Sequence, residues 1–147
     1  PVIASPCFMS LNPHREATMS YAHLTLATQD AAKTADFFET TLLWKRLEMP
    51  ANIDVTAIWM DIGSGQQVHI LQIEGFEVSP FEKEYGRHVA FFHDRADWRS
   101  LQERIREAKS EVVPPLRETP FPRFFFHDPN GYLIEVIERE SFCNEVS

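Results

Sequence analysis

One stretch of sequence decides the fold: Phe124-Phe125-Phe126-His127-Asp128-Pro129-Asn130-Gly131-Tyr132-Leu133-Ile134-Glu135-Val136-Ile137-Glu138. Its centre, 128–131, predicts a tight turn, because proline presets one backbone dihedral and Asn-Gly accepts positive φ. The flanking apolar residues predict the two strands of a hairpin. Alternate strand residues share a face, so Glu135 lies with Leu133 and Ile137 in a strand that is apolar on both faces. A buried carboxylate is protonated, paired with a cation or bound to a metal.

Composition limits the class of protein. The chain has 147 residues, of which 44% are hydrophobic, and this is enough for the core of one domain. A formal net charge of -8 argues against a nucleic-acid partner or an anionic membrane surface. The two cysteines, Cys7 and Cys143, form no CxxC pattern, so we expect two free thiols. Without an apolar run of membrane-spanning length or a signal-peptide pattern, we expect a cytoplasmic protein.

Outward from the hairpin, hydrophobic periodicity predicts the remaining elements. Helices are expected at 30–43, capped by Asp30, and at 97–109, capped by Asp97. Residues 74–86 are expected to form a loop. Strands are expected at 21–27, 44–48, 55–62, 66–73, 87–92 and 112–113. The chain therefore divides into an N-terminal arm (1–20), one domain (21–138) and a C-terminal tail (139–147).

The element order β-α-β-β-β occurs twice, once in a module at 21–73 and once in a module at 87–138. Residues with metal-binding side chains occur at equivalent positions of the two modules: His88 follows His23 by 65 residues, and Glu135 follows His69 by 66. All four are expected on the first and last strands of the two modules. Chance would seldom arrange four such residues in this way.

Imidazole nitrogen and carboxylate oxygen are ordinary ligands of Zn²⁺, Ni²⁺, Mn²⁺, Co²⁺ and Fe²⁺. If the four strands meet on one concave face, then His23, His69, His88 and Glu135 could hold one divalent metal and leave positions open for substrate. The alternative is that the histidines are half-buried structural residues and that Glu135 pairs with an arginine such as Arg123. The position of the set within the repeat favours the metal.

The segments 21–26, 86–91 and 126–135, with the motif Asp128-Pro129-x-Gly131-x-x-x-Glu135, resemble the vicinal oxygen chelate superfamily. This group includes glyoxalase I, extradiol dioxygenases and bleomycin-resistance proteins. The resemblance covers about residues 21–138. It implies an α+β fold in which two βαβββ modules form a cupped mixed sheet with the helices on the outer face. It also implies a divalent metal, held by the residues named above, that binds vicinal oxygens of a small-molecule substrate.

The resemblance leaves several activities open. We favour a glyoxalase-like lyase or isomerase in which Glu135 or His69 moves a proton while the metal stabilises an enolate. An extradiol-type Fe(II) dioxygenase would use His23, His88 and Glu135 as ligands and His69 as the acid-base residue, but Phe125 stands where those enzymes carry a tyrosine. Residues 117–123 replace the potassium loop of fosfomycin-type thiol transferases, which disfavours that activity.

A third possibility is a protein that binds or sequesters a small molecule such as an antibiotic without catalysis. Bleomycin-binding members have generally lost the metal ligands, so the retained set argues against it. For substrate contacts the candidates are Arg123, which could bind a carboxylate or oxyanion, with Phe125 and Trp59 as apolar lining. For Arg123, a salt bridge is an equally good expectation. A homodimer is the default for such a fold.

Overall fold

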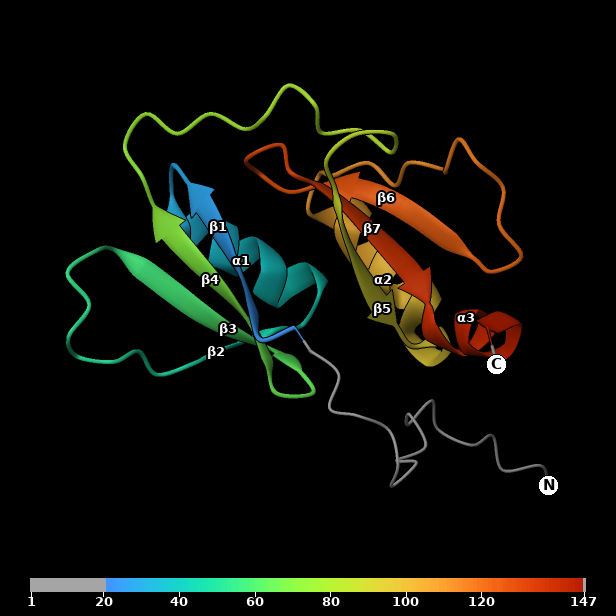
Figure 1. The fold of residues 1–147 in the computed structure, drawn as a ribbon, viewed down its shortest axis with the longest axis horizontal. Helices are drawn as coiled ribbons and strands as arrows, with labels where there is room; N and C mark the ends of the chain where they lie inside the picture. The colour runs from blue at the N-terminus through green and yellow to red at the C-terminus, as the bar shows by residue number, and fades with distance from the viewer. Residues whose placement is uncertain (1–20, 147) are drawn as a thin grey trace.

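The computed structural model describes residues 21–146 and contains two mixed β-sheets (Figure 1). The strand order is β1-β4-β3-β2 in the first sheet and β5-β7-β6 in the second. The strands are β1 (His23–Thr28), β2 (Lys45–Arg46), β3 (Ala57–Gly63), β4 (Gln66–Gln72), β5 (Val89–His93), β6 (Arg123–His127) and β7 (Leu133–Glu138). The helices are α1 (Ala31–Thr41), η1 (Arg95–Asp97), α2 (Trp98–Glu107) and α3 (Arg139–Val146). The predicted α+β class is confirmed.

The first module comprises β1, α1 and β2 to β4. Strand β1 is parallel to β4, and β3 is antiparallel to β4. Helix α1 begins as expected at Asp30, whose Oδ1 accepts a hydrogen bond of 2.9 Å from the backbone N–H of Lys33. Leu26 on β1 and Phe38 on α1 are buried in the same core, which places the helix over one face of this sheet.

The second module repeats the plan with three strands. Strand β5 is parallel to β7, and β6 is antiparallel to β7. The turn between β6 and β7 forms as predicted: the backbone N–H of Gly131 donates to the carbonyl of Asp128 at 3.0 Å, and Gly131 has a φ of 96°. The Asp128 carboxylate closes the turn by accepting the backbone N–H groups of Asn130 and Tyr132, each at 2.9 Å.

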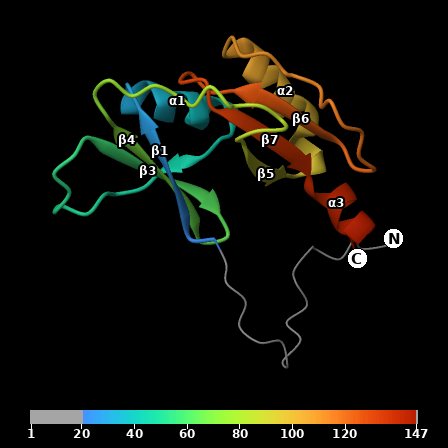
Figure 2. The ribbon, with the colours of Figure 1, turned by 45° about the horizontal axis from the view of Figure 1, so that its top comes forward.

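The two modules share one core, formed on the helix sides of the two sheets (Figure 2). Phe37 of α1 lies 6.1 Å from Phe126 of β6 between ring centroids, and Trp44 lies 5.0 Å from Phe91 of β5. The hairpin turn adds polar links. The Tyr132 hydroxyl donates to the carbonyl of Ala27 at 2.9 Å, and the Asn130 side-chain amide donates to the Thr34 hydroxyl at 3.0 Å. Helices α1 and α2 thus pack against one face of each sheet, whereas α3 contacts the opposite face of β5, where Phe142 lies 5.0 Å from Phe92 between ring centroids.

Several details differ from the sequence expectations. Asp97 lies at the start of α2 but makes no capping hydrogen bond, because its carboxylate is hydrogen-bonded to the side chains of His93 and Arg104 instead. The expected strand at 112–113 is a single bridge between Val113 and Phe125. The expected tail folds as α3. None of the helices in residues 21–146 is long and apolar enough to span a bilayer.

The cysteine prediction also needs a correction. Cys143, on α3, is disulfide-bonded in the structure, so it is not the free thiol that its spacing had suggested. Cys7 and the arm at 1–20 lie outside the described residues.

Candidate metal centre

The four predicted ligands lie on the sheet faces that point away from α1 and α2. In β1, Leu24 and Leu26 contribute to the core, so His23 points the other way. In β4, Val68 and Ile70 are fully buried, and His69 between them points away from α1. The same alternation turns His88 and Glu135 away from α2, because Val89, Ile134 and Val136 pack into the core. The repeat read from the sequence therefore corresponds to equivalent faces of the two sheets.

His23, His69, Trp59 and Gln67 form what we call the N-terminal half-site. The His69 ring lies between two others, with centroids 4.2 Å from His23 and 4.0 Å from Trp59, and all three are nearly parallel. His69 Nε2 lies 2.9 Å from Gln67 Oε1. Since an amide oxygen only accepts, Nε2 carries the proton and Nδ1 has a free lone pair. Burial, and secondarily the charge of His23, lowers the pKa of His69 below its ordinary value.

His88, Glu135, Arg123, Glu84 and Phe125 form the C-terminal half-site. Glu135 is 6% exposed and has a separate partner for each oxygen: Oε1 accepts from Arg123 Nη1 at 2.8 Å, and Oε2 lies 3.2 Å from His88 Nε2. Phe125 is almost fully buried and meets the His88 ring edge-on, with centroids 5.6 Å apart. Of the side-chain atoms described, His88 Nδ1 and Arg123 Nε are buried without a hydrogen-bond partner.

The structure brings these residues together in two pairs rather than as one set of four. His23 contacts His69, and His88 contacts Glu135. Within residues 21–146, no group of three or more His, Cys, Asp or Glu side chains is close enough to hold one metal ion. A complete site made from both pairs therefore needs the half-sites of more than one copy of the chain, or a rearrangement of the modules.

The C-terminal half-site fits a divalent metal. Two ligands each about 2.1 Å from a metal, about 100° apart, are themselves about 3.2 Å apart. The separation of 3.2 Å between His88 Nε2 and Glu135 Oε2 equals that value, so a metal could bind between these two atoms with little movement. The N-terminal half-site fits less completely. Stacked parallel rings do not direct two nitrogens to one point, and His69 Nε2 is already bonded to Gln67.

The residues expected to contact substrate have differing environments. Trp59 is half-buried on the face of the first sheet that points away from α1, where it stacks on His69. Phe125 is packed beneath the Arg123 guanidinium, whose carbon lies 5.5 Å from the ring centroid. Arg123 is 8% exposed, and both its Nη atoms already have protein acceptors. These contacts favour the salt-bridge alternative for Arg123 over substrate binding.

Two residues of the half-sites were not identified from the sequence. Gln67 could have been found, because it lies two residues before His69 and therefore shares its strand face. Glu84 had no such signal, since it belongs to a charged loop without periodicity. Its side chain is 8% exposed and contacts Arg123, 39 residues further along the chain.

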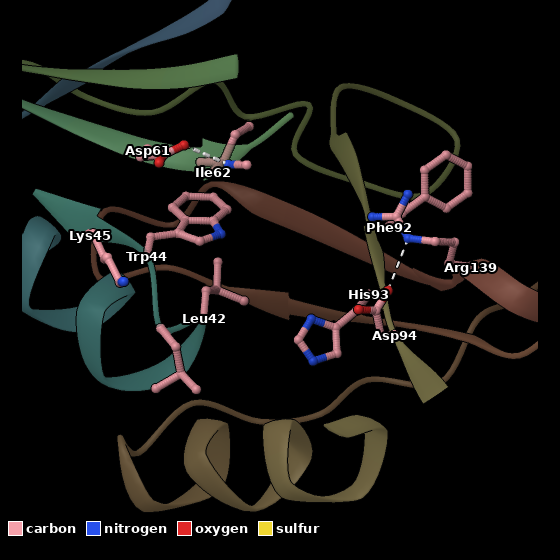
Figure 3. A pocket seen from close by; sticks show the side chains of 11 residues that line it. Leu42, Trp44, Lys45, Asp61, Ile62, Phe92, His93, Asp94 and Arg139 are labelled. Carbon is pink, nitrogen blue, oxygen red and sulfur yellow. Dashed lines mark hydrogen bonds and ion pairs between the residues drawn. The ribbon is translucent and has the colours of Figure 1, made fainter. Parts of the chain in front are cut away.

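A cavity of about 340 Å³ lies away from both half-sites, between the end of α1, strand β3 and strand β5 (Figure 3). Trp44, Lys45, Asp61 and Phe92 contribute to its lining, and Arg139 pairs there with Asp94 at 3.0 Å. None of the predicted site residues lines this cavity. The candidate centre is therefore separate from this cavity and lies on the sheet faces opposite α1 and α2.

A β-α-β-β-β module and a β-α-β-β module, with imidazole and carboxylate side chains on the sheet faces opposite α1 and α2, define a paired-module α+β domain with a candidate metal centre. The sequence model of the Glyoxalase/Bleomycin resistance protein/Dioxygenase superfamily matches residues 20–136. The chain belongs to this superfamily, as the motif around Glu135 had suggested.

Solved structures of other proteins have the same fold. The fosfomycin resistance protein FosX from Listeria monocytogenes, in complex with Mn(II) and 1S,2S-dihydroxypropylphosphonic acid, superposes with a TM-score of 0.70 at 16% identity, over 89% of this chain and 100% of that one. FosX from Mesorhizobium loti gives 0.67 at 17% identity, over 89% and 100%. A glyoxylase/bleomycin resistance protein/dioxygenase domain from Frankia gives 0.69 at 16% identity, over 83% and 93%. No curated protein sequence matches significantly.

Proposed function

We propose that the chain is a metal-dependent, glyoxalase-like lyase or isomerase that acts on a small carbonyl or vicinal-oxygen substrate. The observation that carries this proposal is the spacing of His88 Nε2 and Glu135 Oε2, which equals that of two neighbouring metal ligands. The Mn(II) and vicinal dihydroxy compound in the FosX complex support a divalent metal and paired substrate oxygens as the general chemistry of this fold.

The proposed ligands are His88 and Glu135 of one copy and His23 of a second copy. Two histidines and one carboxylate leave several coordination positions for substrate oxygens. In a two-fold dimer, the N-terminal half-site of each chain would face the C-terminal half-site of the other, so that both pairs of half-sites are completed. This arrangement accounts for the aromatic face around His23 and Trp59, where His23 is exposed within the described residues and a partner chain would shield the rings from water.

His69 is the proposed acid-base residue. Its Nε2–H donates to Gln67, which fixes the tautomer and leaves Nδ1 able to accept a proton. The stacked rings of His23 and Trp59 hold the imidazole plane in place. A bound divalent metal supplies Lewis-acid stabilisation of the negative charge that develops on a substrate oxygen. His69 would remove the proton from the carbon next to a carbonyl and return it to a neighbouring atom.

An extradiol-type Fe(II) dioxygenase is the second candidate. Two histidines and one carboxylate are also the ligand set of non-haem Fe(II) oxygenases, and His69 lies beside His23 as an acid-base group. Oxygen uptake with a catechol substrate, lost when the iron is oxidised, would favour this candidate. A binding protein without catalysis would instead hold a ligand tightly with no turnover and no stoichiometric metal.

Elemental analysis of the purified chain after loading with Mn²⁺, Zn²⁺, Ni²⁺, Co²⁺ or Fe²⁺ tests the proposal. Wild type should hold a stoichiometric metal, and His23→Ala, His88→Ala and Glu135→Ala should lose it. His69→Ala should keep the metal and lose turnover. His127→Ala, at the exposed last residue of β6, is the matched control and should bind metal like the wild type. Absence of metal from the wild type under every loading condition would refute the proposal.

A further inference from the structure

Arg123 is a buried cation held between two buried carboxylates. Its side chain is 4% exposed, and those of Glu84 and Glu135 are each 8% exposed. Nη1 donates to Glu135 Oε1 at 2.8 Å, and Nη2 donates to Glu84 Oε1 and to the carbonyl of Arg117, both at 2.6 Å. We call this pair of hydrogen bonds, from Nη1 to Glu135 and from Nη2 to Glu84, the Arg123 fork. A guanidinium can form it because its donors lie in one rigid plane. One cation between two anions leaves the cluster with a net negative charge.

Backbone hydrogen bonds hold the Glu84 carboxylate in place, and Glu84 in turn holds the Arg123 guanidinium. Its two carboxylate oxygens accept the backbone N–H groups of Leu116 at 2.5 Å and Arg117 at 3.2 Å. Burial alone would raise the pKa of Glu84, but these hydrogen bonds and the one from Arg123 outweigh burial and lower it. For Arg123, burial acts to lower the pKa, and the hydrogen bonds to Glu135 and Glu84 outweigh it and raise it.

We propose that Arg123, anchored by Glu84, is a positioning residue that occupies Oε1 of Glu135 and leaves only Oε2 to bind the metal. This inference rests on the proposed function. Oε2 is the oxygen that lies beside His88 Nε2, so the fork selects the atom that completes the ligand pair. Glu135 then serves as a fixed one-oxygen ligand. Movement of the proton falls to His69, because a carboxylate held from both ends cannot leave the metal and return.

The charge-preserving substitution Arg123→Lys separates geometry from charge. An ammonium cannot reproduce two parallel donors to Glu135 and Glu84, although it keeps the positive charge. We expect Mn²⁺ and Co²⁺ affinity, measured by calorimetry on the full chain, to fall by at least about tenfold, as when other outer-shell partners of a metal ligand are lost. Arg117→Lys is the matched control. Its exposed side chain makes no hydrogen bond or ion pair with the described residues, so its affinity should stay at the wild-type value.

The visible absorption spectrum of bound Co²⁺ is a second measurement, and it does not depend on the overall stability of the protein. When Glu135 is released by Arg123→Lys, both its oxygens become available to the metal, and a higher coordination number weakens the Co²⁺ bands. Wild type and Arg117→Lys should share one spectrum, and Arg123→Lys should have a weaker one. Identical spectra and affinities in Arg123→Lys and wild type would overturn the positioning role.

Glu84→Asp keeps the test decisive if Arg123→Lys fails to fold. The shorter side chain retains its charge but cannot hold the Leu116 amide and Arg123 together, so we expect metal affinity to fall several-fold. Unchanged affinity in Glu84→Asp would count against the fork as well. Failure of the wild type to bind metal refutes the proposed function. If the wild type binds metal and neither Arg123→Lys nor Glu84→Asp changes the affinity, only the role of Arg123 is refuted.

Discussion

The imidazole rings of His23 and His69 lie parallel, with centroids 4.2 Å apart, although their strands come from opposite ends of the first module. Parallel rings present their lone pairs side by side, so the two do not converge on one ion. His69 is further engaged by Gln67, whereas His23 has no hydrogen-bond partner among the described residues. This asymmetry assigns His23 to the metal and His69 to proton transfer in the proposed function.

Sites shared between two chains can be tested by mixing inactive variants. His23→Ala and Glu135→Ala each damage every site of their own homodimer. In a mixed dimer, one site would carry both defects and the other would be intact. After unfolding and refolding of an equimolar mixture, metal content and turnover should recover to about a quarter of the wild-type value. A mixture of His88→Ala and Glu135→Ala is the control and should recover nothing, because both residues belong to the same half-site.

Asp97 should stabilise the fold only above acid pH. Hydrogen bonds from Arg104, opposed by burial and reinforced by His93, lower its pKa from 3.8 to about 2. A lowered folded-state pKa contributes stability that is fully present above about pH 4 and is lost as the pH falls towards 2. Urea unfolding of wild type and Asp97→Asn should therefore differ near neutral pH and converge in that acid window. Asp54→Asn, at an exposed loop position, should show no such pH-dependent difference.

Gly131 should tolerate alanine less well than Gly75. Both have positive φ, 96° and 71°, so alanine at either position costs about 1–3 kcal/mol of backbone strain. A Cβ at Gly131 would also lie 3.1 Å from Val78 Cγ1, whereas a Cβ at Gly75 would meet nothing within 4 Å. We expect Gly131→Ala to lower the free energy of unfolding, measured by urea denaturation, more than Gly75→Ala does. The difference between the two losses measures the contact with Val78. Equal losses would show that the neighbouring loop moves aside without cost.

Burial predicts which phenylalanines carry the stability of the chain. Phe126 is fully buried in the shared core, and Phe126→Ala should lower the free energy of unfolding by about 3–5 kcal/mol. Phe81 is 66% exposed, and Phe81→Ala should change the free energy of unfolding by less than about 0.5 kcal/mol. Thermal or urea unfolding of both variants checks the contrast. A small effect at Phe126 would mean that the two modules do not share the core described above.

The positions of the candidate ligands could be predicted because strand alternation depends only on local sequence. Apolar residues on either side of His69 and Glu135 fixed the face on which each side chain lies. The resemblance of the motif around Glu135 supplied the superfamily, which the family match confirms. The sequence also raised the pairing of Glu135 with Arg123 as an alternative, and the structure contains that ion pair.

Other features depend on contacts between distant parts of the chain. Glu84 reaches Arg123 and the loop at 116–117, and no periodicity in its own segment indicates those partners. Asp97 has the residue type and position of a helix cap, but Arg104 and His93 compete for its carboxylate. The separation of the ligands into two pairs depends on how the modules pack, and a repeat in one chain does not determine that packing.

The turn between β6 and β7 does more than reverse the chain. Through Tyr132 and Asn130 it bonds to Ala27 and Thr34, about a hundred residues away, immediately beside the strand that carries Glu135. Local opening of the second module must therefore break bonds to the first. Backbone amides of β1 and β7 should then exchange their hydrogens with solvent at one common free energy, as members of a single cooperative unfolding unit.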